Sequence, residues 1–298
     1  MINKDLEILK SWNDEDSKRA ILDFLRTAEV KGPDYIKPED RIATFDNDGT
    51  LWVEKPVAVW FDFMFKAFYK AAIDDPFLAH LEPYNAILEN DQDYISKIVD
   101  QNPEALLSLE KALAHAWGGK TPDEFDKEVS DFISTAKHAD FQVSYTKLIY
   151  KPMLELFELL HEHQYRVFVC SGGGRDFMRS IAESTLGIFK ENIIGTAAEY
   201  EYKNGELIRI NKVLGGISLG PGKVEHIFAT AGRYPVFAVG NSDGDIEMLD
   251  ISRFKLIINH DDSDREYSYT DGAENVLNNA EEKGYTILSM KNDWKQIF

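Results

Sequence analysis

Three short segments of the chain carry side chains that could do chemistry together, and each follows an apolar run typical of a buried strand. The segments are Asp46-Asn47-Asp48-Gly49-Thr50, Ser171-Gly172-Gly173-Gly174 and Asn241-Ser242-Asp243-Gly244-Asp245. Lys223 adds an ammonium group near the start of a predicted helix, just before the third apolar run. Ligands bind at the carboxyl ends of strands in open α/β sheets, so we expect these pieces to meet at one edge.

The donor types in these segments favour a hard cation such as Mg²⁺. Carboxylates and other oxygen groups are present, whereas Cys and His are absent from the three segments. A divalent cation would let Asp46, Asp48 and Asp245 lie close together without taking up protons. Each segment alone is also typical of a capped helix terminus, where Asp, Ser and Gly are common. The order of all the pieces together favours a functional site.

Alternating strands and helices must position these segments. Short β-prone runs at residues 41–46, 166–170, 235–240 and 254–259 alternate with helical patterns at 150–163, 175–185, 221–232 and 244–250. Strands separated by helices imply right-handed crossovers and a mostly parallel sheet. A further helical pattern covers residues 15–29, and alternating runs around Asn204-Gly205 predict a hairpin.

Residues 54–146 have a different sequence pattern, in which helical patterns are joined by polar turns and no convincing strand is present. Thr121 and Glu124 form a capping-box pattern around Pro122, which predicts a helix start there. We interpret this block as a mainly α-helical cap domain inserted into the α/β core. The expected organisation is a first part of the core over residues 1–53, the cap over 54–146 and the remaining core over 147–298.

At this point the motifs carry a family resemblance. The runs FDNDGTL and VFVCSGGG, then Lys223, then VGNSDGDIEML resemble, in this order, the four motifs of the haloacid dehalogenase (HAD) superfamily of phosphatases. The position of the helical insert resembles the subgroup that includes phosphoserine phosphatase. The resemblance implies a three-layer Rossmann-like parallel sheet and a Mg²⁺-dependent phosphomonoester hydrolase that forms an aspartyl-phosphate intermediate.

The resemblance also implies a role for each matching residue. Asp46 would be the nucleophile, and Asp48 would be the general acid and then the base that activates water. Carbon–halogen hydrolysis needs no such acid, so Asp48 favours a phosphatase over a dehalogenase. Phosphate-binding residues would be Thr50, Ser171, the Gly172 amide and Lys223, and the Mg²⁺ ligands would be Asp46, Asp48, Asn241 and Asp245.

Two departures from the motifs leave the substrate open. Asn241 stands where phosphoserine phosphatases have an acidic metal ligand, and Asp243 could supply the missing charge. Glu54 lies near the glutamate that meets the substrate ammonium in those enzymes, but it is one residue out of register. Phosphoserine and phosphocholine are the specific alternatives, within the general class of a small-molecule phosphoester.

Two further groups of residues have open interpretations. An aromatic run could either pack the cap or form a cage for a cation such as choline, and it consists of Trp52, Trp60, Phe61, Phe63, Phe65, Phe68 and Tyr69. Arg175 and Arg179, one helical turn apart, could contact a substrate anion or form an ordinary solvated helix face.

The composition sets limits on partners and location. Lys and Arg total 33 against 52 Asp and Glu, and the net charge of −19 disfavours nucleic acid and anionic membrane surfaces. Cys170 is the sole cysteine, so no intramolecular disulfide can form, which fits a reducing cytoplasm. The charged N-terminal sequence shows no signal peptide, although a removed export signal would leave the periplasm open. We expect no membrane span. The oligomeric state stays open.

Three rival interpretations of the motifs are weaker. Cys170 and Arg175 have four residues between them, whereas the cysteine-dependent phosphatase loop needs five. Gly216-Ile217-Ser218-Leu219-Gly220 matches a nucleophile elbow, so Ser218 with Asp245 and His260 would describe a serine esterase, but a polar segment precedes it. A non-enzymatic phosphate sensor would gain nothing from two adjacent anions at Asp46 and Asp48.

Overall fold

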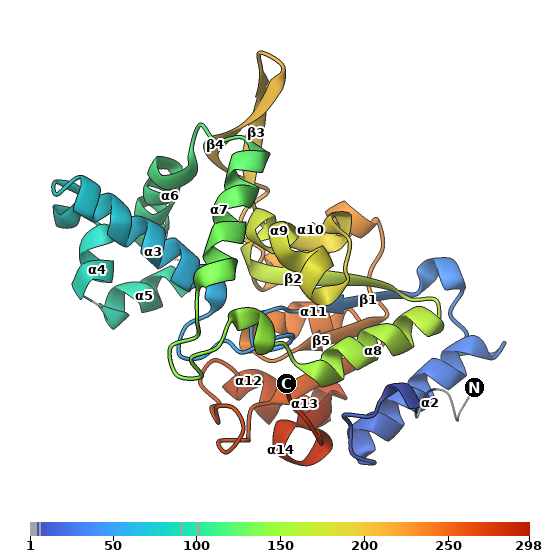
Figure 1. The fold of residues 1–298 in the computed structure, drawn as a ribbon. Helices are drawn as coiled ribbons and strands as arrows, with labels where there is room; N and C mark the ends of the chain where they lie inside the picture. The colour runs from blue at the N-terminus through green and yellow to red at the C-terminus, as the bar shows by residue number, and fades with distance from the viewer. Residues whose placement is uncertain (1–4, 6, 90, 100–101) are drawn as a thin grey trace.

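The computed structural model describes residue 5 and residues 7–89, 91–99 and 102–298. In this part of the chain a seven-stranded sheet has the order β4-β3-β2-β1-β5-β6-β7 (Figure 1). All neighbouring strands are parallel except β3 and β4, which form an antiparallel hairpin. The strands are β1 Ile42–Phe45, β2 Arg166–Gly174, β3 Ile193–Lys203, β4 Glu206–Leu214, β5 Phe237–Gly240, β6 Phe254–Asn259 and β7 Thr286–Ser289.

Successive side chains along each strand point to opposite faces of the sheet, and an apolar cluster packs against each face. In β2, Val167 and Val169 belong to one apolar cluster, whereas Phe168 and Cys170 belong to a second cluster. The same alternation recurs along β5 and β6. The central strands therefore have mostly apolar sequences, as expected for a parallel sheet, whereas the hairpin strands β3 and β4 carry exposed polar residues.

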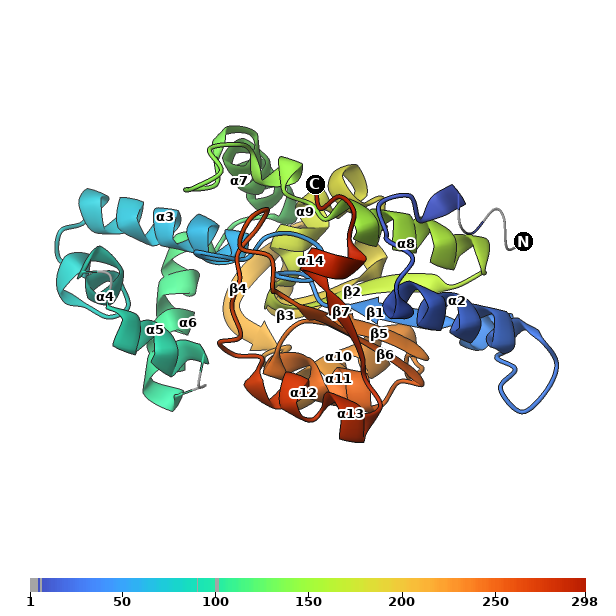
Figure 2. The same cartoon turned by 90° about the horizontal axis from the view of Figure 1, so that it is seen from below.

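Helices cover the two faces and complete three layers (Figure 2). One face packs against α2 Asp16–Glu29, α8 Lys151–Glu162, α9 Arg175–Leu186 and α14 Met290–Asp293. The other face packs against α10 Pro221–Ala231, α11 Ile246–Asp250, α12 Glu274–Asn278 and α13 Ala280–Lys283. The described 3₁₀ turns are Pro38–Asp40, Leu78–His80, Tyr145–Lys147, Lys190–Asn192 and Asp243–Asp245. The predicted three-layer α/β class is confirmed.

Most predicted elements are present, including the hairpin, and there are two differences. The hairpin turns at Asn204 and Gly205, whose φ angles of 51° and 96° are left-handed. The Ser171–Gly174 segment continues β2 through a shift in register instead of turning at Ser171. Strand β7 and the short helices α12, α13 and α14 have no counterpart in the sequence prediction.

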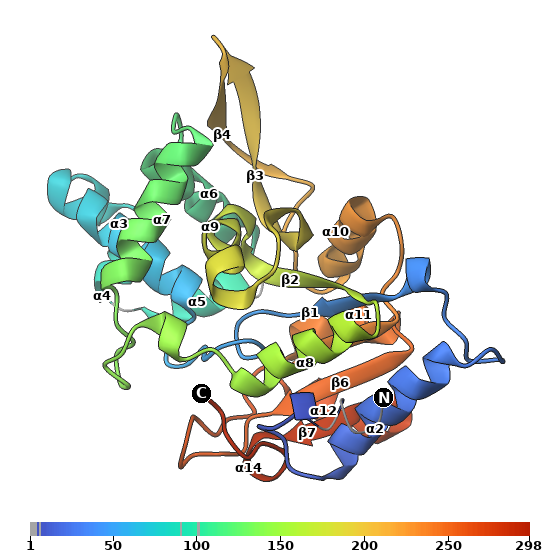
Figure 3. The ribbon, with the colours of Figure 1, turned by 45° about the vertical axis from the view of Figure 1, so that its right-hand side comes forward.

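The regular elements described between β1 and α8 are all helices. It comprises α3 Val59–Asp74, α4 Tyr84–Glu89, α5 Gln92–Val99, α6 Pro103–Trp117 and α7 Pro122–Thr135. Thr121 caps α7, and its capping box with Glu124 is formed. Figures 1 and 3 show these helices to one side of the sheet, with the hairpin of β3 and β4 beside α6 and α7.

An aromatic core joins this helical block to the sheet layer. Phe63 stacks on Trp117 with ring centroids 5.1 Å apart, and it lies 5.2 Å from Phe177 of α9. Phe68 is also buried there. The predicted packing role of the aromatic run therefore holds for these residues, and the block shares its core with α9. None of the described helices has the length and apolar character needed to cross a membrane.

Candidate active site

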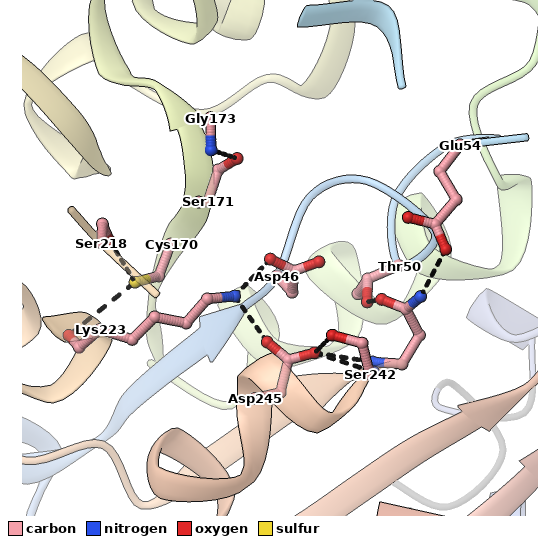
Figure 4. Close-up of polar contacts among 12 residues, drawn as sticks. Asp46, Thr50, Glu54, Cys170, Ser171, Gly173, Ser218, Lys223, Ser242 and Asp245 are labelled. Atoms are coloured by element: carbon pink, nitrogen blue, oxygen red, sulfur yellow. Dashed lines mark hydrogen bonds and ion pairs between the residues drawn. The ribbon is translucent and has the colours of Figure 1, made fainter. Parts of the chain in front are cut away.

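The candidate site lies at the carboxyl ends of β1 and β5, next to the start of α10 (Figure 4). Asp46 is the first residue after β1, and its backbone N–H donates to Val239 of β5 over 2.9 Å. Asn241 is the first residue after β5. The parallel pairing of β1 with β5 thus brings the first and fourth motifs together, as the sequence predicts.

A buried ion triad occupies the centre of the site. The Lys223 Nζ lies 2.5 Å from Asp46 Oδ1 and 2.5 Å from Asp245 Oδ1, and all three residues are buried. Burial raises the pKa of Asp46 well above its ordinary value, with Asp245 and Asp48 adding to the shift and Lys223 opposing it. Burial alone would lower the pKa of Lys223, but Asp245 and Asp46 outweigh it and raise that pKa. Lys223 is therefore a charged ammonium at neutral pH.

Asp245 supports the site rather than facing it. Its Oδ2 accepts from the backbone N–H of Asn241 at 3.0 Å, the N–H of Ser242 at 3.1 Å and the Ser242 hydroxyl at 3.2 Å. Its Oδ1 is bound to Lys223. Both oxygens of Asp245 are engaged here in holding Lys223 and the loop, and its role as a metal ligand stays a prediction.

Thr50 also holds a neighbour in place. Its fully buried hydroxyl donates to Asn241 Oδ1 over 3.0 Å, and the residue does not line the cavity of the site. Thr50 therefore orients Asn241 in this structure, and its predicted contact with phosphate stays a prediction. Asn241 Nδ2 in turn donates to Glu54 Oε1 over 3.1 Å.

Glu54 is a further carboxylate that lines the cavity beside Asp46 and Asp48. Its Oε1 accepts from Asn241 Nδ2 and, at 2.6 Å, from the hydroxyl of Tyr269, and burial raises its pKa. Asp243, which the sequence indicates could supply the charge missing at Asn241, points elsewhere. Its carboxylate accepts from the backbone N–H of Val276 at 2.8 Å and from Asn275 Nδ2 at 2.7 Å, at the start of α12.

Asp48 and the glycine run face the cavity. Asp48 Oδ1 accepts from the indole N–H of Trp52 over 2.9 Å, and burial raises the pKa of Asp48. The Ser171 hydroxyl accepts from the backbone N–H of Gly173 over 3.0 Å, so it orders the run. The predicted direct contact of Ser171 with phosphate stays a prediction, whereas the Gly172 backbone does line the cavity.

Gly49 must be glycine for two separate reasons. Its φ of 75° is left-handed, and a Cβ there would lie 2.8 Å from Glu54 Cδ and would overlap the Asn241 amide. Gly49→Ala is therefore expected to displace Asn241 and Glu54, with a loss of catalytic rate and of more than about 2 kcal/mol in the free energy of unfolding. Gly119→Ala is the control, because Gly119 has a φ of 82° with nothing within 4 Å. Equal losses in both variants would contradict this reasoning.

The two rival nucleophiles are not assembled. Ser218 Oγ lies 3.7 Å from Cys170 Sγ, while His260 contacts the carbonyl of Gly49 at 2.8 Å through Nε2 and Glu266 at 3.2 Å through Nδ1. Both ring nitrogens of His260 are thus engaged away from Ser218. The serine esterase interpretation has no support in this geometry.

Cys170 is buried beneath the site, and burial raises the pKa of its thiol to about 12. Because the thiolate is the reactive form, iodoacetamide at pH 8 is expected to leave Cys170 unmodified in the native protein. The same reagent should modify it in urea, as intact mass would show. Rapid native labelling would contradict the buried placement.

The cavity at the site has a volume of about 350 Å³. Asp46, Asp48 and Lys223 line its inner end, and α3, α6 and the β3–β4 hairpin form the rest of its wall. Arg175 and Arg179 do not line it. Their Nε atoms donate instead to Asp176 at 3.4 Å and to the carbonyl of Lys190 at 3.0 Å.

A hydrated divalent cation fits the donors at this inner end. Among the described residues no group of three His, Cys, Asp or Glu side chains could hold a metal alone. The second oxygen of Asp46 points away from Lys223 (Figure 4), and Asn241 Oδ1 and the Asp48 carboxylate are further oxygen donors. Mg²⁺ keeps several waters and binds proteins through one or two carboxylates, so this sparse set suits it.

The chain is similar to one known protein family and to several solved structures. The model of the haloacid dehalogenase-like hydrolase family matches residues 43–250, and a comparison with curated proteins found no match. A conserved protein of unknown function from Anaerococcus prevotii is similar in structure, with a TM-score of 0.59 and 15% identity over 97% of each chain.

Two solved enzymes are also similar. Cytosolic 5′-nucleotidase IIIB bound to cytidine has a TM-score of 0.50 and 14% identity, over 93% of this chain and 88% of that one. A substrate-bound phosphoserine phosphatase has a TM-score of 0.42 and 17% identity, over 75% and 87% respectively. The family match spans most of the chain and contains all four motifs. The chain therefore belongs to the haloacid dehalogenase-like hydrolase family.

Proposed function

We propose that the protein is a Mg²⁺-dependent phosphomonoester hydrolase that acts on a small metabolite through an aspartyl-phosphate intermediate. The observation that carries this proposal is the pairing of Asp46 with Lys223 at the inner end of the cavity, with Asp48 also lining it. A carboxylate nucleophile beside a fixed ammonium and a second carboxyl group suits phosphoryl transfer in two steps.

In the first step, a carboxylate oxygen of Asp46 attacks phosphorus, and the bond between phosphorus and the leaving alkoxide oxygen breaks. Lys223 offsets the charge on Asp46 and on the phosphoryl group, and the backbone N–H groups around Gly172 donate hydrogen bonds to the phosphoryl oxygens. Asp48 donates its proton to the leaving alkoxide. The raised pKa of Asp48 favours this role because it keeps the proton bound closer to neutral pH.

In the second step, the Asp48 carboxylate takes a proton from water, and that water attacks the phosphorus of the acyl phosphate. Free Asp46 and inorganic phosphate result. Asp46, Asp48 and Asn241 would hold Mg²⁺, which supplies charge neutralisation for the transferring phosphoryl group.

We also propose that residues 54–146 act as a cap domain over this site, inserted between core parts 1–53 and 147–298. Cap opening would admit the substrate, and closure would exclude bulk water while the aspartyl-phosphate forms. A single buried cysteine fits a cytoplasmic location. The partner is a small phosphoester rather than nucleic acid, in keeping with the charge of −19.

Phosphate release from a panel of small phosphomonoesters, with MgCl₂ or with EDTA, tests this proposal. We expect hydrolysis with Mg²⁺ and its loss with EDTA, restored when excess Mg²⁺ is added back. Hydrolysis that survives EDTA would remove the metal from the proposal, and the absence of hydrolysis across the whole panel would remove the phosphatase activity itself.

A further inference from the structure

We propose that the group esterified to phosphate in the substrate is uncharged and apolar, such as an alkyl or aryl alcohol. This inference rests on the proposed function and names its substrate class. It follows from the walls of the cavity beyond Asp46, which are apolar, and from the cations in those walls, which are already paired.

One face of α6 forms an apolar wall. Leu106, Leu109 and Leu113 line the cavity, and their spacing of three and four residues places them in a row along the helix. Ile210 and Val213 of β4 also line the cavity, and α6 packs against β4. A substrate that reaches past the phosphoryl site therefore meets aliphatic side chains from two elements.

A second anionic group on the substrate would meet cations that already lie beside acidic side chains, although Arg209 Nη1 has no hydrogen-bond partner. Besides Lys223, the described cavity wall contains two cations, Arg209 and Lys212. Arg209 Nη1 lies 3.5 Å from Asp176 Oδ2, and its guanidinium lies 4.5 Å from the centre of the Phe125 ring. Lys212 Nζ lies 2.8 Å from Glu199. A carboxylate, as in phosphoserine, or a second phosphate would have to displace one of these pairs.

A cationic group on the substrate would also find no matching site in the cavity wall. Within the aromatic run, Trp60 and Phe61 reach the cavity, but Trp60 packs against Gly174 and has its ring 5.6 Å from that of Phe177. The run therefore supplies no cage of several open faces for a quaternary amine. The buried carboxylate of Glu54 is bound to Asn241 and Tyr269, and Glu110 is exposed to water, which weakens any pairing there.

The size of the cavity also fits an organic group larger than phosphate alone. Its volume of about 350 Å³ lies at the lower end of the range for pockets that enclose small organic ligands. Such pockets are mostly apolar, with a few polar groups that fix orientation. Here Asp46, Lys223 and the glycine run would fix the phosphoryl group, and the aliphatic walls would select the remainder.

Binding of phosphonates, which are not hydrolysed, tests the inference by calorimetry with MgCl₂ present. Each methylene that leaves water is worth about 0.8 kcal/mol, so affinity should rise up to about fourfold per methylene. We expect octylphosphonate to bind at least about tenfold more tightly than methylphosphonate. An eight-carbon phosphonate whose chain ends in a carboxylate or a trimethylammonium group should bind at least about tenfold more weakly than octylphosphonate. Equal binding of methyl- and octylphosphonate, or equal binding of the charged chains, would overturn the inference.

A pair of variants on α6 locates the effect. Leu109→Asn should weaken octylphosphonate binding about tenfold and leave methylphosphonate binding unchanged. Leu107→Asn is the matched control, because Leu107 is 52% exposed and does not line the cavity. Thermal unfolding of both variants shows whether they fold. If Leu109→Asn is unfolded, Val213→Thr on β4 makes the same test, with the same expected direction.

Failure of this inference and failure of the proposed function give different results. If the protein hydrolyses methyl phosphate through Asp46 but prefers short or charged leaving groups, the proposed function is supported and the apolar substrate class is wrong. A protein that binds octylphosphonate tightly but hydrolyses no phosphoester loses the proposed function, and with it the assignment of a substrate.

Discussion

Asp46→Asn is expected to lower the rate of phosphate release on the order of 10⁴-fold or more, because the amide cannot form the acyl phosphate. The fold should survive, since Lys223 keeps its second partner, Asp245, at 2.5 Å. Steady-state phosphate release with a Mg²⁺ titration gives the rate, and circular dichroism with urea unfolding shows whether the variant is folded. Activity within tenfold of the wild type would exclude Asp46 as the nucleophile.

Asp243→Asn is a matched control for this experiment. It makes the same chemical change in the fourth motif, but the Asp243 carboxylate is bound at the start of α12 by Asn275 and Val276. Activity should stay within about threefold of the wild type, and stability should fall by about 1 kcal/mol because a capping carboxylate is weakened. A large loss of activity in Asp243→Asn would place this carboxylate in the chemistry, against the observed contacts.

The positions of Asp46, Asn241 and Lys223 could be predicted because they depend on local pattern and on one general rule. Apolar runs identify β1 and β5, and parallel strands bring their carboxyl ends to the same edge. The capping box at Thr121 is equally local, since its two partners are three residues apart. Patterns of this kind are visible in any single sequence.

The contacts of Thr50, Glu54 and Asp245 could not be predicted because their partners are set by tertiary structure. Glu54 is bound by Asn241 and Tyr269, which lie 187 and 215 residues further along the chain. No spacing rule connects such positions. Asp243 and Asp245 are both aspartates in the same motif, so the sequence does not distinguish them. Asp243 binds the start of α12, whereas Asp245 holds Lys223.

Short elements without a strong period were also missed. Strand β7, Thr286–Ser289, is as long as β1 and β5, but only one of its four residues is buried, so it offers no buried apolar run. Helix α12 has five residues, too few for a helical pattern to be read. The contribution of the hairpin to the cavity needed the structure as well. Arg209 enters the wall because β4 folds back beside α6, a contact between segments about a hundred residues apart.

Lys223→Met is expected to lower the free energy of unfolding by about 3–5 kcal/mol at pH 8, because it leaves two buried carboxylates without their counter-ion. Lys223 is 2% exposed and contacts both Asp46 and Asp245 at 2.5 Å. Hydrolysis should be lost as well, since the phosphoryl group and the nucleophile would repel one another. Lys212→Met is the control, because the pairing of Lys212 with Glu199 is on the surface and worth at most about 1 kcal/mol.

The sign of the pH dependence separates this explanation from a simple loss of packing. Burial and Asp245 already raise the pKa of Asp46, and Lys223 is the main group that opposes this rise. Without Lys223 the folded-state pKa of Asp46 lies further above its unfolded value, which is about 4. The folded variant then binds more protons than the unfolded chain, so its stability decreases as the pH rises from about 4 through the raised pKa. Urea unfolding at pH 5 and pH 8 should therefore show Lys223→Met recovering part of its deficit relative to the wild type at pH 5. A deficit of the same size at both pH values would mean that the loss comes from packing and not from unpaired charge.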